Sequence, residues 1–199
     1  MTLEQTPNRP RGRPRRAAAR QAIVDATLAL LAERGFQGTT IEAIATRAGV
    51  GRNTIYRRWS TKEELLADAL RELTAELDVR LEGDLHSRLL TMIREFTHLF
   101  ADPLFSRIVP AVLGELQRNP AFARLYADRV VRPRRQALVD LLHQAVERGE
   151  CREDADVEQV ADLLAGAPFV RLLPLGLPPI GEGYEEELLA TIWNGIKPD

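Results

Sequence analysis

The sequence is poor in the residue types that build most catalytic and metal sites. It contains 1 cysteine, so no disulfide can form within the chain, and this usage is typical of a reducing cytoplasm. Its 3 histidines lie far apart, with no second ligand close to any of them, which argues against a metal centre. A glycine-rich phosphate loop and a nucleophile elbow are also missing. We therefore expect no enzymatic activity, no metal and no cofactor.

Long apolar runs are missing as well. The longest nearly uncharged stretch, residues 163–181, contains Arg171 and four prolines. A membrane-spanning helix needs about twenty apolar residues in a row. The first residues carry arginine and proline where a secretory signal needs an apolar core. The composition predicts a cytoplasmic protein without a membrane partner.

The residues that are present favour helices and a polyanionic partner. The chain of 199 residues is 45% apolar and 6% aromatic, which suits an all-helical fold with a sizeable core. Residues 1–64 hold 12 Arg or Lys against 6 Asp or Glu, whereas the remainder holds 15 against 23. This asymmetry suggests that one end of the molecule binds a polyanion while the other stays away from it.

Residues 39–62, TTIEAIATRAGVGRNTIYRRWSTK, have the pattern of two short helices joined by a tight turn. Gly49 ends the first helix, because glycine tolerates the left-handed backbone that a reversal needs. Ile55 anchors the second helix and Trp59 closes the segment. The small side chain of Ala45 lets the two helices cross closely, as in a helix-turn-helix. The apolar face of the first helix consists of Ile41, Ile44, Ala45 and Ala48.

The second helix turns outward a set of side chains that suits nucleic-acid recognition. Arg pairs with guanine and Asn with adenine in the major groove, while Tyr hydroxyls and further Arg contact phosphates. We predict that Arg52, Asn53 and Thr54 read bases. The alternative is a solvated, charged surface helix, which does not explain why turn glycine, small crossing residue and apolar anchors agree. The outward set is Arg52, Asn53, Thr54, Tyr56, Arg57 and Arg58.

These motifs resemble the N-terminal DNA-binding domain of the TetR family of bacterial transcriptional repressors. The resemblance covers residues 17 to about 70, with a first helix ending ERGF, the segment described above, and a further helix opening STKEELL. Gly51 departs from the family pattern, which commonly has Ser or another side-chain cap there, so base contact from this position is lost. The resemblance implies that Thr40, Tyr56, Arg57 and Lys62 hold phosphates.

The chain is expected to divide into a disordered basic arm (residues 1–16), a helix-turn-helix domain (17–62) and a C-terminal body for ligand binding and dimerisation (63–199). Phe36 is expected to fill the core of the head, and Pro110 and Pro133 to kink or break their helices. Apolar spacing predicts helices at 17–34, 61–81, 85–101, 104–117, 121–148, 157–172 and 183–196. Expected caps are Thr39 or Thr40 for the second helix and the Ser60/Glu63 capping box for the fourth.

The arm contains Pro10-Arg11-Gly12-Arg13-Pro14, which matches the core of an AT-hook. Flanking prolines keep such a peptide extended, and Arg11 and Arg13 could enter the narrow minor groove of A·T-rich DNA. The alternative is a flexible tail that attracts phosphates without sequence preference.

The body is rich in apolar residues that either form a filled core or line a small-molecule site, and their spacing does not distinguish the two. The family resemblance implies a ligand site, with His98, Glu115, Arg118 and His143 as polar candidates. Predicted lining residues are Phe96, Phe100, Val109, Val112, Phe122, Tyr126, Leu142 and Phe169. Predicted dimer contacts in the last two helices are Ala161, Leu164, Ala165, Pro168, Leu188, Leu189, Ile192 and Trp193.

The sequence predicts an all-helical, homodimeric, ligand-responsive repressor that binds a palindromic double-stranded operator. A small-molecule effector would displace the fourth helix and change the separation of the two heads. One alternative is an architectural binder of A·T-rich DNA that uses the Arg-Gly-Arg arm without an effector. The other is a helical enzyme or carrier whose basic head is incidental.

Overall fold

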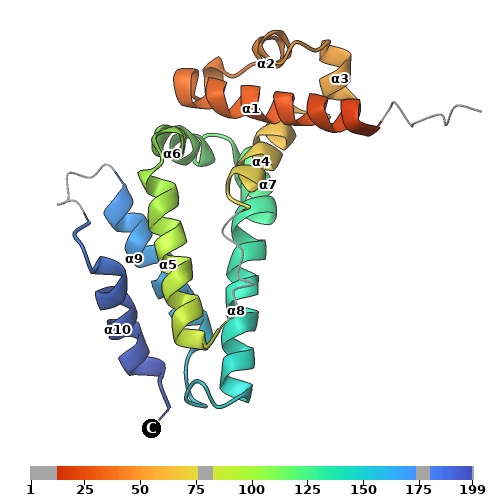
Figure 1. The fold of residues 1–199 in the computed structure, drawn as a ribbon. Helices are drawn as coiled ribbons and strands as arrows, with labels where there is room; N and C mark the ends of the chain where they lie inside the picture. The colour runs from red at the N-terminus through yellow and green to blue at the C-terminus, as the bar shows by residue number, and fades with distance from the viewer. Residues whose placement is uncertain (1–12, 76–82, 174–179, 199) are drawn as a thin grey trace, which may run out of the picture.

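A computed structural model describes residues 13–75, 83–173 and 180–198, and every regular element within these ranges is helical. Figure 1 shows a head, formed by the first helices, lying across one end of a bundle of longer helices. The all-helical prediction is confirmed. Within the same residues, no helix has the length and apolar content that crossing a bilayer requires.

The head consists of α1 (Arg13–Gly38), α2 (Ile41–Arg47) and α3 (Arg52–Tyr56), closed by the start of α4 (Lys62–Leu73). Gly49 ends the first helix of the pair as predicted, with φ 65°, a region that side-chain-bearing residues rarely adopt. Gly35 has φ 66° and interrupts α1 near its end. The core of the head is fully packed by apolar side chains from α1 to α4, including Ile23, Ile44, Ile55, Trp59 and Leu65.

The helix ends of the head differ from the predictions in three places. α1 begins at Arg13, so part of the expected basic arm is helical and the Arg-Gly-Arg peptide is not extended throughout. Thr61, not Ser60, caps α4, accepting a hydrogen bond from the Glu64 amide at 3.1 Å, while the Ser60 amide binds the Glu64 carboxylate at 2.7 Å. α4 ends at Leu73, well before residue 81. Thr40 caps α2, as one of the two expected alternatives.

The body contains α5 (Leu85–Ala101), α6 (Pro103–Leu116), α7 (Pro120–Tyr126), α8 (Arg132–Glu147), α9 (Val157–Leu172) and α10 (Tyr184–Ile196). A π-helical turn, η1 (Ala127–Val131), joins α7 to α8 without a break, so Pro133 sits in the first turn of α8. Pro110 lies within α6 and does not end it. The core of the lower body is built by α5, α8, α9 and α10.

The head is joined to the body by a shared core. Phe36 was expected to fill the head, but it packs instead against Phe122 of α7, with ring centroids 4.8 Å apart. Val24 and Leu28 of α1 and Leu66 of α4 belong to the same buried cluster. Because α4 contributes to both cores, a shift of α4 must move the head relative to the body.

Candidate DNA-binding face and effector cavity

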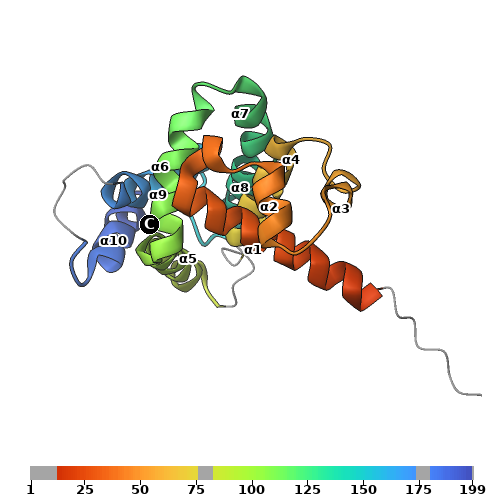
Figure 2. The same ribbon diagram turned by 90° about the horizontal axis from the view of Figure 1, so that it is seen from above.

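The exposed face of the head is formed by α3 and the start of α2. Ile55 is buried beneath α3, whereas Arg52, Asn53, Tyr56 and Arg57 point into solvent and Thr54 is half-buried. The Tyr56 side chain is 50% exposed, which is high for a large aromatic residue. Tyr56 therefore contributes little to the core of the head. Figure 2 shows α3 at the side of the head away from α9 and α10.

Two of the predicted DNA contacts, Arg52 and Thr40, already have hydrogen-bond partners within the head. The Arg52 guanidinium pairs with Glu42 of α2 at 2.9 Å, and both side chains are mostly exposed. Hydrogen bonds from its own backbone amide and from Arg52 lower the pKa of Glu42. Thr40 is exposed and its hydroxyl accepts a hydrogen bond from the Ala43 amide at 3.2 Å. Arg52, predicted to read a base, is therefore engaged in an ion pair with Glu42 in this structure.

Two predicted DNA contacts fare differently from the rest. The Lys62 ammonium donates to the carbonyl of Phe36 at 3.0 Å and lies 4.2 Å from the Phe36 ring centroid. Burial lowers the pKa of Lys62. This hydrogen bond uses one of the three donors of the ammonium, so the phosphate contact of Lys62 stays a prediction. Arg11 lies outside the described residues, and Arg13 is the first residue of α1.

A cavity of about 520 Å³ lies between the end of α4, helices α5, α6, α8 and α9, and the η1 turn. Of the predicted lining residues, Phe96, Phe100, Val109, Val112, Tyr126 and Phe169 do line it. Phe122 and Leu142 do not, because Phe122 fills the core between head and body and Leu142 fills the lower body core. The apolar spacing in the sequence predicted that all eight side chains point into the body. It did not show which of them pack in a filled core and which border the cavity.

None of the four polar candidates, His98, Glu115, Arg118 and His143, lines the cavity. His98 and His143 are exposed, and Glu115 is buried with the Gln37 amide, which donates to it at 3.1 Å and 3.2 Å. The wall instead includes Thr74, Tyr126, Arg134, Arg135 and Asp162. Tyr126, Val130, Arg134 and Leu138 all line the cavity at four-residue spacing. This regular spacing was the available signal in the sequence.

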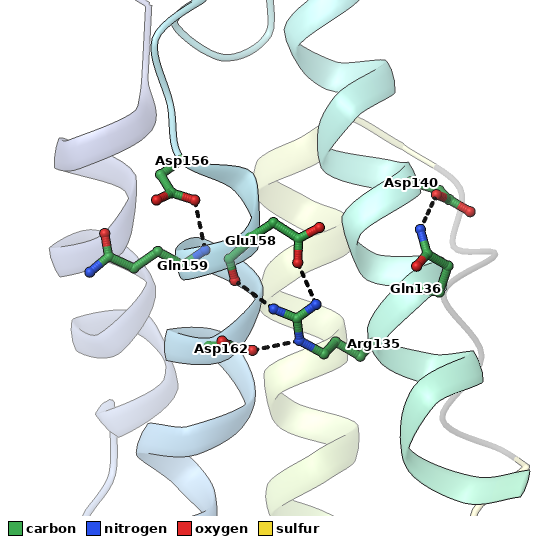
Figure 3. A network of polar contacts seen from close by, with 7 residues as sticks. All are labelled: Arg135, Gln136, Asp140, Asp156, Glu158, Gln159 and Asp162. Carbon is green, nitrogen blue, oxygen red and sulfur yellow. Dashed lines mark hydrogen bonds and ion pairs between the residues drawn. The ribbon is translucent and has the colours of Figure 1, made fainter. Parts of the chain in front are cut away.

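Arg135 ties α8 to α9 across one edge of the cavity (Figure 3). Its guanidinium donates to Asp162 at 2.7 Å and also binds the carboxylate and the backbone carbonyl of Glu158. The hydrogen bond from Arg135 holds the pKa of the Asp162 carboxyl below its usual range. The positive charge of Arg135 is therefore fully matched by acidic partners.

A series of contacts connects the cavity wall to Trp59, which lies just beyond α3. Val130 of η1 lines the cavity, and its neighbour Arg129 donates to Asp68 of α4 at 2.8 Å. The other oxygen of Asp68 accepts a hydrogen bond from the indole of Trp59 at 2.9 Å. Trp59 lies just beyond α3 and is buried in the head core. π-helical turns are frequent at functional sites, and this one lies at the meeting point of cavity and α4.

An exposed apolar surface lies on α9, beside α10. Leu163 and Val170 are each 49% exposed. Of the predicted dimer contacts, Ala161, Leu164, Pro168, Leu189 and Ile192 are buried within the protomer, so most of them serve its own core. A shallow groove beside Leu163 also includes Ala167 and Leu188. Leu163 and Val170 are seven residues apart and therefore lie on one face of α9, and the sequence analysis did not name either of them as a dimer contact.

The packed helix-turn-helix, its exposed cationic reading helix and the helical body together define a helix-turn-helix DNA-binding protein. Residues 23–69 match the family model described as bacterial regulatory proteins, tetR family. Residues 79–192 match the model described as tetracyclin repressor-like, C-terminal domain. The chain belongs to the TetR family of transcriptional regulators.

Similar proteins agree with this assignment. The chain is 32% identical over 189 residues to the transcriptional regulator YdeS of Bacillus subtilis, covering 94% of each. It is 28% identical to the transcriptional repressor KstR2 of Mycobacterium tuberculosis, with 89% of this chain and 92% of that protein covered. The crystal structure of the TetR family regulator SCO0332 superposes with a TM-score of 0.73 at 28% identity, covering 90% of this chain and 99% of that one. The chain is therefore a DNA-binding transcriptional regulator.

Proposed function

We propose that the protein is a homodimeric repressor that reads a palindromic operator with α3 and releases it when a small molecule fills the cavity. The observation that carries this proposal is the contact chain from Val130 in the cavity wall through Arg129 and Asp68 to Trp59. It links a space able to hold a ligand with the segment that presents the DNA-reading side chains.

The reading face has the chemistry for both kinds of DNA contact. Arg52, Asn53 and Thr54 would read base edges, and Thr40, Tyr56 and Arg57 would hold phosphates. One short helix reads only a few base pairs. Two heads related by a two-fold axis read two half-sites about 34 Å apart, or a multiple of that spacing. The exposed Leu163 and Val170 on α9 support α9 and α10 as the surface that pairs the two protomers.

Release requires the effector to prefer the arrangement of heads that does not bind DNA. A preference of about 1.4 kcal/mol weakens operator binding tenfold. Leu70 of α4, its C-cap Thr74 and Val130 of η1 all line the cavity, so a ligand there would push on the two elements that carry the Arg129–Asp68 pair. α4 then carries the displacement to the head.

Salt-dependent binding to a selected duplex tests the DNA part of the proposal. Duplexes are first selected from a random library with the full chain, and the affinity is then measured at 50 and 200 mM salt. If six or more phosphates are contacted, we expect affinity to fall about a thousandfold or more. A variant lacking residues 1–12 is the control for the arm, because it removes Arg11 and leaves α1 intact. A preference for A·T tracts that disappears in this variant would favour the architectural alternative.

A further inference from the structure

The cavity carries one positive charge without a matching negative one. Of its polar wall residues, Arg135 and Asp162 bind each other, and the Thr74 hydroxyl donates to the carbonyl of Leu70 at 2.7 Å. Arg134 and Tyr126 remain. Within residues 13–75, 83–173 and 180–198, neither the Arg134 guanidinium nor the Tyr126 hydroxyl has a hydrogen-bonding or ion-pair partner.

Arg134 is half-buried in a largely apolar wall, so its guanidinium loses part of its hydration, and this loss is unfavourable unless something compensates the charge. Burial lowers the pKa of Arg134, and the neighbouring ionisable group is Tyr126, whose own pKa is raised by burial. Tyr126 therefore stays a neutral hydrogen-bond donor, while an arginine keeps its charge in proteins. The two residues together offer donors and no strong acceptor, so they suit an anion.

The facing walls of the cavity are apolar and rich in aromatic rings. The Phe100 ring of α5 packs against Phe96 in a tilted arrangement and edge-on against Phe105 of α6 and Phe169 of α9, with centroids 4.9, 4.7 and 5.7 Å apart. Tyr126 and Arg134 come from the continuous segment of α7, η1 and α8 on another side. A ligand that fills about 520 Å³ touches both the phenyl rings and the two donors.

We propose that the effector is a hydrophobic monocarboxylic acid. Its apolar body packs against the four phenylalanine rings, and its carboxylate binds the Arg134 guanidinium and the Tyr126 hydroxyl. One feature favours a single carboxylate over a phosphate or a polyanion: the neighbouring Arg135 is already paired with acidic groups and offers no second positive charge. The guanidinium fork of Arg134 can then bind both oxygens of the carboxylate. The inference rests on the proposed role of the cavity as the effector site and specifies what enters it.

Matched pairs of acids and amides test this inference on the full-length chain. The probes are 2-naphthoic acid, 4-phenylbutanoic acid and decanoic acid, each compared with its primary amide by titration calorimetry. We expect at least one acid to bind about tenfold or more tighter than its amide. Arg134→Gln should reduce that ratio to near one while the amide still binds, and Arg134→Lys should retain part of it.

Arg132→Gln is the matched control, because Arg132 lies on the same helix, is exposed and pairs with Asp128. It should leave the ratio of acid to amide affinity unchanged. Equal binding of acids and amides, failure of every acid to bind, or a ratio that survives Arg134→Gln would overturn the inference. Unfolding curves of each variant establish that the fold is intact.

Operator release by the same probes separates this inference from the proposed function. If an acid binds through Arg134 but leaves operator affinity unchanged, the carboxylate site stands and the ligand-released repressor fails. If a neutral amide releases the operator as well as its acid does, the repressor function stands and the acid specificity is wrong.

Discussion

The head and the body use their apolar residues in opposite ways. In the head, Ile23, Ile44, Ile55 and Leu65 are fully buried in a closed core, and the functional groups stand on the outside. In the body, four phenylalanines surround a space of about 520 Å³. A filled interior holds an outer reading face rigid, whereas a hollow interior lets an added molecule change the packing. The following predictions test this difference, from the largest expected effect to the smallest.

Truncating a phenylalanine should cost far more in the filled core than at the cavity wall. Phe122 is completely buried between head and body, so Phe122→Ala should lower the free energy of unfolding by about 3–5 kcal/mol. Phe96 already borders empty space and is only half-buried, so Phe96→Ala should cost about 1–2 kcal/mol. Urea unfolding of the two variants measures both values. Equal losses would mean that the cavity is filled in solution.

Substitutions on the reading face should change DNA binding without changing stability. Arg52→Ala should cost about 1–3 kcal/mol of operator affinity and relax preference at one base position, while Arg57→Ala should weaken binding to all duplexes similarly. Glu42→Gln should strengthen binding slightly, because it frees Arg52 from an exposed ion pair. Fluorescence anisotropy with the selected operator and single-base variants measures all three. If neither arginine variant alters affinity, a different face docks on DNA.

Removing the charge of Asp68 should weaken the communication between cavity and head. Asp68→Asn keeps the size of the side chain but loses the ion pair with Arg129, and should lower the free energy of unfolding by about 1 kcal/mol. The larger change should be in regulation, because the ratio of operator affinities without and with the effector should shrink. Gln37→Ala is the control, since Gln37 bonds Glu115 between head and body but does not touch Asp68. An unchanged ratio in Asp68→Asn would exclude this route.

The Arg135 pairing should contribute a small, pH-dependent stabilisation. Arg135 lowers the pKa of Asp162, so the stabilisation is present above the ordinary carboxyl pKa of about 4 and is lost as pH falls through the lower folded pKa. Arg135→Gln should therefore be less stable than wild type at pH 7, with the difference shrinking at pH 3. In Arg135→Gln, the carboxyl resonance of Asp162, followed by NMR, should titrate at the ordinary pKa of an aspartate. A difference in stability that does not depend on pH would contradict the assignment.

The sequence predicted the head better than the body because exposure follows from helical spacing there. The turn at Gly49, the cap at Thr40, buried Ile55 and exposed Tyr56 each depend on local rules, and the structure has all four. Helices over 85–101 and 157–172 were also predicted to the residue. The early end of α4 was missed, since a threonine late in an apolar pattern does not by itself mark a helix end.

Contacts between segments far apart in the sequence could not be predicted from local sequence patterns. Phe36 leaves the head core for Phe122, 86 positions further along the chain, and Lys62 folds back onto Phe36. Apolar spacing indicates that a side chain turns inward, but whether its neighbours reach it depends on how the helices are arranged. For the same reason, the sequence did not show that Arg134 and Tyr126 line one cavity, although their spacing of eight residues could be read from it.

Hydroxyl-radical footprinting of the full chain on its selected duplex, with and without the tightest cavity ligand, tests the central claim most directly. We predict two symmetric protected segments about 34 Å apart, or a multiple of that spacing, that disappear together when the ligand is added. A single continuous footprint over an A·T tract, unchanged by any cavity ligand, would contradict it.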